Sequence, residues 1–203
     1  MKTEKLARAL FFEAKFTGRD RNAQRALLER ARDAGEEAIA ILRRRAAASG
    51  QPLARDAKPR KIAAALSGDR DAAPTFFWSA VAWGEWGLVV SRVKAAKAGA
   101  APRVRDYSTT VIALDPAYEE GGGYRVLGRL HHRAPRIPGL TGWVSRAEGI
   151  RNLRLAVKTA PHNFVNRHFL AEALADGNSA AKSEAIRIER ELVSDAPSPT
   201  HLV

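Results

Sequence analysis

Residues 114–128, LDPAYEEGGGYRVLG, contain the pattern that decides the fold. Asp115 and Pro116 predict a turn between two helices, because proline ends one helix and its fixed φ suits the first turn of the next. The triple glycine that follows predicts a tight entry into a helix, since glycine adopts backbone angles that other residues avoid. Further along, Gly128 allows a second helix to approach closely. The stretch therefore predicts two helices packed against each other.

The proline turn recurs along the second half of the chain. Pro116, Pro161 and Pro197 lie 45 and 36 positions apart. A tetratricopeptide repeat has a period of about 34 residues and carries a proline at the end of its second helix. The extra length of the first interval falls on residues 135–142, PRIPGLTG. This composition predicts a loop inserted between paired helices.

Residues between the turns follow the register of such a repeat. In the W-x2-L-G-x2-Y pattern of a first repeat helix, Tyr124 replaces the tryptophan and His131 replaces the tyrosine. The second helix then places two apolar residues before the next proline. The predicted structural positions of the repeat are Asp115, Pro116, Leu127, Gly128, Leu153, Ala156 and Pro161.

Helix-forming residues extend this pattern to the whole chain. Ala, Leu, Arg and Glu dominate the composition, and all four favour helices. We therefore predict an all-α fold: a TPR-like helical repeat array, or α-α superhelix, with a central buried aromatic helix. A single domain, 1–203, would comprise an N-terminal helical pair (1–51), a linker with a short helix (52–73), a central apolar helix (74–98), TPR-like helix pairs (102–195) and a tail (196–203).

The segment 74–98 is apolar nearly all round. A membrane span is one interpretation, but Glu85 in its middle would cost roughly 2.5–3.5 kcal/mol in lipid. A helix buried among its neighbours is favoured, and no membrane span is expected. Trp83 and Trp86 are three positions apart, so they share one helix face, and Trp86 forms the middle of an aromatic arc that includes Trp78.

Two roles remain open for this aromatic helix: core packing, or the lining of a groove for an apolar ligand or partner. A buried carboxylate is costly unless it is paired. Glu85 therefore either pairs with an arginine of a neighbouring helix, or faces a cavity and orients a ligand. The cavity residues would be Trp78, Trp86 and Tyr124. The candidate ligand- or partner-binding residues are Trp78, Glu85, Trp86, Tyr124, Arg125, Arg129 and His131.

The charge of the chain invites a nucleic-acid interpretation. The formal net charge is +12, from 34 Lys and Arg against 22 Asp and Glu. Basic residues recur singly, however, and the only dense cluster is Arg43-Arg44-Arg45. A solvated basic surface is therefore favoured, and a basic helical module on nucleic acid is the alternative function.

No motif indicates catalysis, a metal or a cofactor. The chain has no cysteine, which excludes disulfides and thiolate chemistry. Gly121-Gly122-Gly123 has no following Gly-Lys-Ser/Thr, so it is not a phosphate loop. His131 and His132 are adjacent and would diverge on a helix, which makes them poor ligands for one ion. We expect a non-enzymatic protein without a cofactor.

Taken together, these motifs resemble the T component of TRAP transporters, the tetratricopeptide-repeat proteins associated with tripartite ATP-independent periplasmic transporters. The resemblance covers about Leu6 to Leu174. The segments that carry it are FFWSAVAWG (76–84), ALDPAY (113–118), the triple glycine (121–123), Leu127-Gly128 and the Pro–Gly loop before Ala147.

The resemblance implies a helical bundle with a pore or groove, self-association, docking to a substrate-binding protein, and a small apolar or acidic ligand. The expected function is a non-enzymatic scaffold for protein–protein association in a solute transport system. The sequence departs from the family in two ways, by its basic charge and by the absence of a lipobox cysteine and leader. We expect a cytoplasmic protein if Met1 is the native start, and a periplasmic one if a leader was removed.

Overall fold

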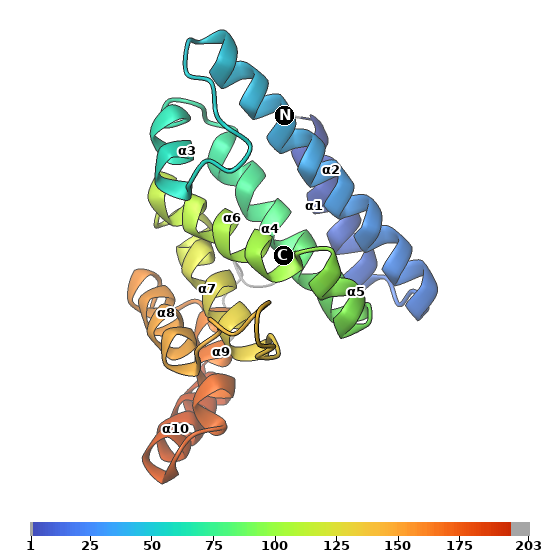
Figure 1. Cartoon of the computed structure of the whole chain (residues 1–203). Coiled ribbons are helices and arrows are strands. Elements are labelled where there is room, and N and C mark those ends of the chain that lie inside the picture. The colour runs from blue at the N-terminus through green and yellow to red at the C-terminus, as the bar shows by residue number, and fades with distance from the viewer. Residues whose placement is uncertain (1, 196–203) are drawn as a thin grey trace.

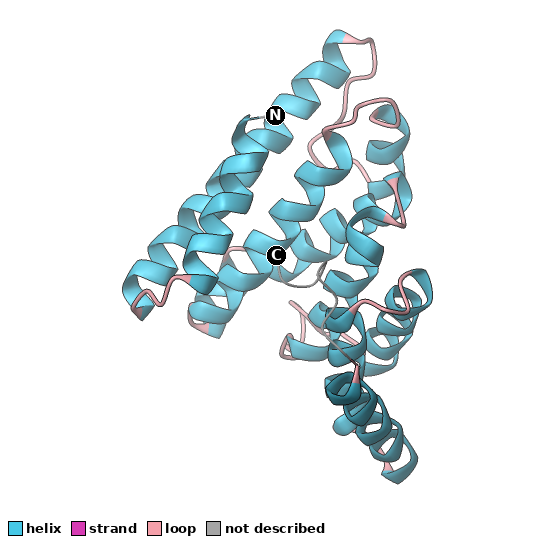
Figure 2. Ribbon diagram, turned by 180° about the vertical axis from the view of Figure 1, so that it is seen from behind, coloured by secondary structure: helices cyan, strands magenta, loops and turns pink. Residues whose placement is uncertain are grey.

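The computed structural model describes residues 2–195. The predicted tail 196–203 and the proline turn at Pro197 lie outside the described residues. All regular structure in the described part is α-helical, and Figure 2 shows helices joined by loops, so the predicted all-α class is confirmed. The helices are α1 (Lys2–Phe16), α2 (Arg21–Ala48), α3 (Pro59–Ala65), α4 (Ala72–Val89), α5 (Arg92–Lys97), α6 (Ala100–Leu114), α7 (Tyr118–Arg133), α8 (Arg146–Thr159), α9 (Phe164–Ala175) and α10 (Ser179–Ser194).

Short polar residues set the starts of several helices. The Asp20 side chain accepts hydrogen bonds from the backbone N–H groups of Asn22, at 2.8 Å, and Ala23, at 3.0 Å, and so caps α2. Ser145, Asn163 and Asn178 cap α8, α9 and α10 in the same way. Each cap satisfies an N–H group that has no partner within its own helix.

The predicted central helix 74–98 is wrong in its extent, because the structure divides this segment into α4 and α5. Val90 has an extended backbone, and the Ser91 side chain accepts a hydrogen bond from the N–H of Lys94 at 3.2 Å. Ser91 therefore caps a new helix. An apolar pattern alone does not reveal such a break, because apolar residues continue through it at Val89, Val90 and Val93.

The N-terminal helices form the larger part of the core. The antiparallel pair of α1 and α2 lies along one side of the molecule, and α4 and α6 pack beside it (Figure 1). Phe76 and Trp86 of α4 are almost completely buried, at 0% and 1% exposure. The aromatic helix predicted to be central thus packs against α1, α2, α6 and α7.

The C-terminal helices pack as successive neighbours, α7 with α8 and α9 with α10, and extend away from the N-terminal part (Figure 1). Their own apolar cluster includes Leu153, Leu170 and Ile188. The repeat positions Leu153 and Ala156 are fully buried, and Gly128 of α7 lies against Leu153. Asp115 accepts a hydrogen bond from the Ala117 N–H at 2.9 Å, while Leu127 is half-buried and Pro116 and Pro161 are exposed in turns.

The start of α7 has an unusual backbone. Glu119, Glu120 and Gly121 all have positive φ, at 48°, 56° and 81°, and form a left-handed turn before the regular helix. Residues other than glycine avoid this region, at a cost of roughly 1–2 kcal/mol each. The next residue, Gly122, packs directly under the ring of Phe77, where an added Cβ would lie 2.5 Å from a ring carbon. The predicted tight helix entry is therefore present, in a left-handed form.

Candidate functional site

A large groove runs between the N-terminal and C-terminal helices. It has a volume of about 1730 Å³. Its lining comes from α1, α4, α5, α6, α7, α9 and α10, together with the loop after α7. Most of the lining surface is apolar. A cavity of this size with a few polar groups is typical of a ligand- or partner-binding site.

Exposed apolar side chains concentrate at this groove. Nine large hydrophobic residues are exposed in the described part of the chain, and six of them line the groove. Val193 and Phe16 are the most exposed of the six, at 86% and 71%. Contiguous exposed apolar surface marks interaction sites in soluble proteins. The six residues are Phe16, Leu88, Leu140, Phe164, Val165 and Val193.

Aromatic rings form one wall of the groove. Phe11 and Phe12 of α1 each lie 5.8 Å from Trp78 of α4, measured between ring centroids. Phe16 extends this wall and stacks on Phe12 at 5.5 Å. Trp78 therefore lines the groove, and the rings beside it come from α1, which the sequence analysis did not include among the candidate residues.

Glu85 also lines the groove, but its ion-pair partner is not an arginine of α7. Lys15 of α1 forms an ion pair with it at 2.7 Å. Neither Arg125 nor Arg129 contacts it, and of the three aromatic residues predicted to share a cavity only Trp78 lies in the groove lining. The carboxylate is thus both paired and directed into the groove.

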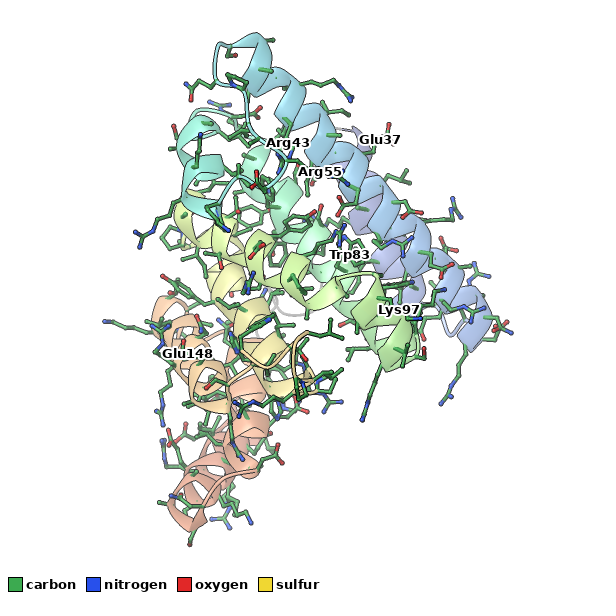
Figure 3. All side chains as sticks on the ribbon, in the orientation of Figure 1. Glu37, Arg43, Arg55, Trp83, Lys97 and Glu148 are labelled. Carbon is green, nitrogen blue, oxygen red and sulfur yellow. The ribbon has the colours of Figure 1, made fainter. Side chains whose placement is uncertain are left out.

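The other two tryptophans of α4 form hydrogen bonds to α2, although Trp83 also lines the groove. Trp86 donates a hydrogen bond to Glu29 at 3.3 Å, and Trp83 donates one to Glu36 at 2.6 Å. The two rings meet edge to face at 5.5 Å, as their spacing predicted. Arg32 stacks over both rings, which adds a cation–π contact. Figure 3 shows Trp83 in the middle of the molecule. Trp86 is 1% exposed and lies outside the groove lining, which is the core-packing alternative of the two roles left open for this helix.

Arg125 of α7 lines the groove and is half-buried. Its Nη1 atom donates to the backbone oxygen of Glu119 at 3.1 Å and to the side-chain oxygen of Asn166 at 2.9 Å. Both acceptors are neutral. Burial lowers the pKa of the guanidinium, because removal from water disfavours the charged form, although an arginine still stays protonated.

Arg129 lies one turn further along the same face and also lines the groove. It differs from Arg125 because it pairs with the carboxylate of Glu172 and stacks over the Phe169 ring, with 4.0 Å from its central carbon to the ring centroid. Its charge is therefore balanced within the chain. The contact joins α7 to α9.

Tyr124 and His131 lie outside the groove lining. The ring of His131 meets Trp143 edge to face at 5.5 Å, and its Nδ1 accepts a hydrogen bond from the Ser145 N–H at 3.1 Å. His131 thus holds the residue that caps α8. Burial lowers the pKa of His131 below its ordinary value, which favours the neutral ring that this bond requires.

We expect this contact to make the stability of the fold depend on pH. A lowered folded pKa means that the unfolded chain binds the proton more readily, so stability is full above about pH 6.5 and falls as the pH drops below it. Asparagine places an amide oxygen near the position of Nδ1 and does not titrate. Urea unfolding of the wild type and His131→Asn between about pH 7.5 and pH 5.5 should therefore show the smaller loss in the variant. Equal losses in the two proteins would contradict this role.

Several groove residues carried no clear signal in the sequence. Phe16 ends α1, and Phe164 and Val165 begin α9, so none of them belongs to a long periodic stripe. Leu140 lies in the loop that makes the first proline interval long, and this loop supplies part of the groove wall. The sequence marked these groove residues only as apolar side chains at helix ends and in an inserted loop.

The basic cluster of the sequence does not form one positive face. Arg43 donates to the Ala54 carbonyl at 2.7 Å, and Figure 3 shows it beside Arg55. Arg45 pairs with Asp71 at 2.8 Å and with Asp69 at 3.3 Å. The neighbouring cations are therefore directed to different partners, and no observation here favours nucleic acid as a ligand.

Two further kinds of site are absent from residues 2–195. No group of three His, Asp or Glu side chains within this range is arranged to hold a metal ion. None of the helices in the same range is both long enough and apolar enough to cross a membrane.

These features define an all-α helical array built around a largely apolar groove. The family model of the TRAP transporter T-component matches residues 6–182, close to the range over which the resemblance was recognised. The chain belongs to this family, whose members are accessory subunits of a transport system and not a known family of enzymes. No curated protein matches the sequence.

Proposed function

We propose that this chain is a non-enzymatic accessory subunit of a solute transport system, and that its groove holds a ligand with an apolar body. The observation that carries the proposal is the concentration of exposed apolar side chains in one groove, six of nine in the described part. Burying these side chains against a ligand would stabilise the complex by about 25 cal/mol for each Å² of apolar surface removed from water.

The proposal includes a protein partner. Val193 and Phe16 are 86% and 71% exposed, so the fold itself covers little of their apolar surface. Exposed apolar residues at the edge of a groove suit contact with another protein. A substrate-binding protein of the same transporter, or a second copy of this chain, is the proposed partner. Sedimentation of the isolated chain tests self-association, and co-purification with a substrate-binding protein encoded beside it tests the other contact.

Polar substitutions in the groove should weaken the binding of an uncharged apolar probe such as Nile red. Leu88→Asp and Phe164→Asp each place a charge on the lining, and we expect a loss of affinity of about tenfold or more because the probe cannot compensate the buried charge. Both residues are already exposed, so the free energy of unfolding should change by about 0.5 kcal/mol or less. Fluorescence titration measures the affinity.

Val93→Asp is the matched control, because Val93 is also an exposed apolar residue but lies outside the groove. Its affinity for the probe should equal that of the wild type. Equal losses in all three variants, or no loss in any, would count against the groove as the binding site.

The cellular compartment, cytoplasmic or periplasmic, remains a proposal that rests on the sequence. Fractionation of cells that express the full gene would test it.

A further inference from the structure

One end of the molecule combines exposed apolar side chains with exposed basic ones. We call this end the basic tip; it comprises residues 15–21, which connect α1 to α2, and residues 88–97, which end α4 and form α5. No residue of α5 is buried. The tip also holds three of the nine exposed large hydrophobic residues, at 71%, 53% and 64% exposure: Phe16, Leu88 and Val93. The fold itself therefore leaves this surface largely uncovered.

The direction of the helices brings the two segments of the tip together. The central carbon of the Arg8 guanidinium in α1 lies 5.1 Å from the ring centroid of Trp78 in α4. Seven residues later in both helices, Lys15 pairs with Glu85 at 2.7 Å. The two helices therefore run parallel and end at the same side of the molecule. Figures 1 and 2 both show α5 beside the turn between α1 and α2.

Basic side chains dominate the charge of the tip. It contains six basic residues and one acidic residue, Asp20. Three of the cations pair with carboxylates outside the tip: Lys15 with Glu85, Arg19 with Glu13, and Lys94 with Glu29. The other three are exposed and form no ion pair with any described residue: Arg21, Arg92 and Lys97. Positive charge therefore remains in excess even when the four neighbouring carboxylates are counted.

The opposite end of the N-terminal helices lacks one half of this combination. It is also basic, but no large hydrophobic side chain is exposed in residues 17–87. Arg45 there pairs with Asp71 at 2.8 Å. Arg43 donates to the Ala54 carbonyl. Basic residues without exposed apolar neighbours are typical of a solvated face, so the apolar side chains distinguish the tip.

We propose that the basic tip docks the protein on a membrane surface that carries anionic phospholipid headgroups. Apolar and basic side chains together suit the boundary of a bilayer, because the apolar groups enter the acyl region while the cations contact the headgroups. Each Lys or Arg near an anionic surface strengthens binding about fivefold. An acidic polymer would use the cations but leave the apolar side chains in water.

This docking is independent of any ligand in the groove. Phe16 and Leu88 line the groove as well as the tip, whereas Val93 belongs to the tip alone. Arg21 and Lys97 also lie outside the groove lining. Substitutions at these last three positions therefore test the tip without altering the groove.

Sedimentation with sucrose-loaded vesicles measures the docking of the full chain. Vesicles of phosphatidylcholine alone are compared with vesicles in which about 30% of the lipid is phosphatidylglycerol, which supplies the anionic headgroups. We expect the chain to bind the anionic vesicles about tenfold or more tightly than the neutral ones at about 0.1 M salt. Most of this difference should disappear at about 0.5 M salt, because the added ions screen the charges.

Arg21→Gln/Lys97→Gln removes two unpaired cations of the tip, and we expect the affinity for anionic vesicles to fall about tenfold or more. Arg60→Gln/Lys61→Gln is the matched control. It also removes one exposed arginine and one exposed lysine, but from α3, at the other end of α2 (Figure 1). Its affinity should stay within about twofold of the wild type, since these charges lie away from the docked surface.

Val93→Ser tests the apolar part of the contact. Val93 is 64% exposed, so the substitution should leave the fold intact. The affinity for anionic vesicles should fall about threefold or more, because less apolar surface leaves water on docking. Ile186→Ser is the control, since Ile186 is 53% exposed on α10, outside the tip, and its loss should not change the affinity.

Several results would overturn the inference. Failure to bind either kind of vesicle, or equal binding to both, would refute docking on an anionic membrane. Equal losses in the two double variants would show that net charge acts without the tip. Binding to polyglutamate as tight as to anionic vesicles, together with no effect of Val93→Ser, would assign the surface to an acidic macromolecule instead. Circular dichroism of each variant shows whether its fold is retained.

Discussion

Gly128→Leu is expected to lower the free energy of unfolding by roughly 1–3 kcal/mol, the typical cost of overpacking a tight core. A Cβ at Gly128 would lie 2.6 Å from Leu153 Cγ and 3.0 Å from the backbone oxygen of Gly149. The side chain of Leu153 can move, but the backbone of α8 cannot do so without separating from α7. Urea unfolding followed by circular dichroism measures the effect.

Gly84 provides a matched control in another helix. A Cβ there would meet only Val104 Cγ2, at the ordinary contact distance of 3.9 Å. We expect Gly84→Ala to be neutral or to stabilise the fold by about 0.5–1 kcal/mol, because alanine loses less backbone freedom than glycine in a helix. Gly128→Ala should destabilise it. If both alanine variants stabilised the protein equally, the close approach of α7 and α8 at Gly128 would be refuted.

The sequence predicted this contact because the relevant information is local. Helical periodicity, prolines at turns and a small residue before the next helix all act over short distances along the chain, and they indicated the all-α class and the burial of Leu153 and Ala156. Periodicity also placed Trp83 and Trp86 side by side correctly. It could not say which neighbouring helix would cover them, since that depends on packing between distant segments.

The groove could not be predicted from the sequence for the same reason, because it also depends on packing between distant segments. Its wall combines α1 with α9 and α10, which are more than 140 positions apart in the sequence. The partner of Glu85 is Lys15, seventy residues earlier, and no rule of spacing connects them. The left-handed backbone of Glu119 and Glu120 was also hidden, because glutamate rarely adopts it and tertiary contacts impose it here. Arg125 was a candidate from its position, but its hydrogen bonds to Asn166 and to the Glu119 carbonyl are visible only in the structure.

The contacts that impose this backbone converge on Asn166 of α9, which is fully buried. Its Nδ2 group donates to the backbone oxygens of Glu120, at 2.8 Å, and Ala156, at 3.1 Å. Its Oδ1 accepts from Arg125 at 2.9 Å. One side chain therefore holds the left-handed turn, the end of α8 and the guanidinium in fixed relative positions.

Asn166→Ala should consequently cost roughly 2–4 kcal/mol in the free energy of unfolding, because it leaves buried polar groups without partners and opens a cavity. The backbone oxygen of Glu120 loses the hydrogen bond from the Asn166 side chain, and Arg125 keeps the Glu119 carbonyl alone. The Ala156 oxygen retains the N–H of Ala160 at 3.0 Å, which limits the cost. Urea unfolding again supplies the measurement.

Asn178→Ala is the control for this substitution, since Asn178 is an asparagine that only caps a helix, through the Ala181 N–H at 3.0 Å. Loss of such a cap costs about 1 kcal/mol. If Asn166→Ala were no more harmful than this, the buried network would not stabilise the turn.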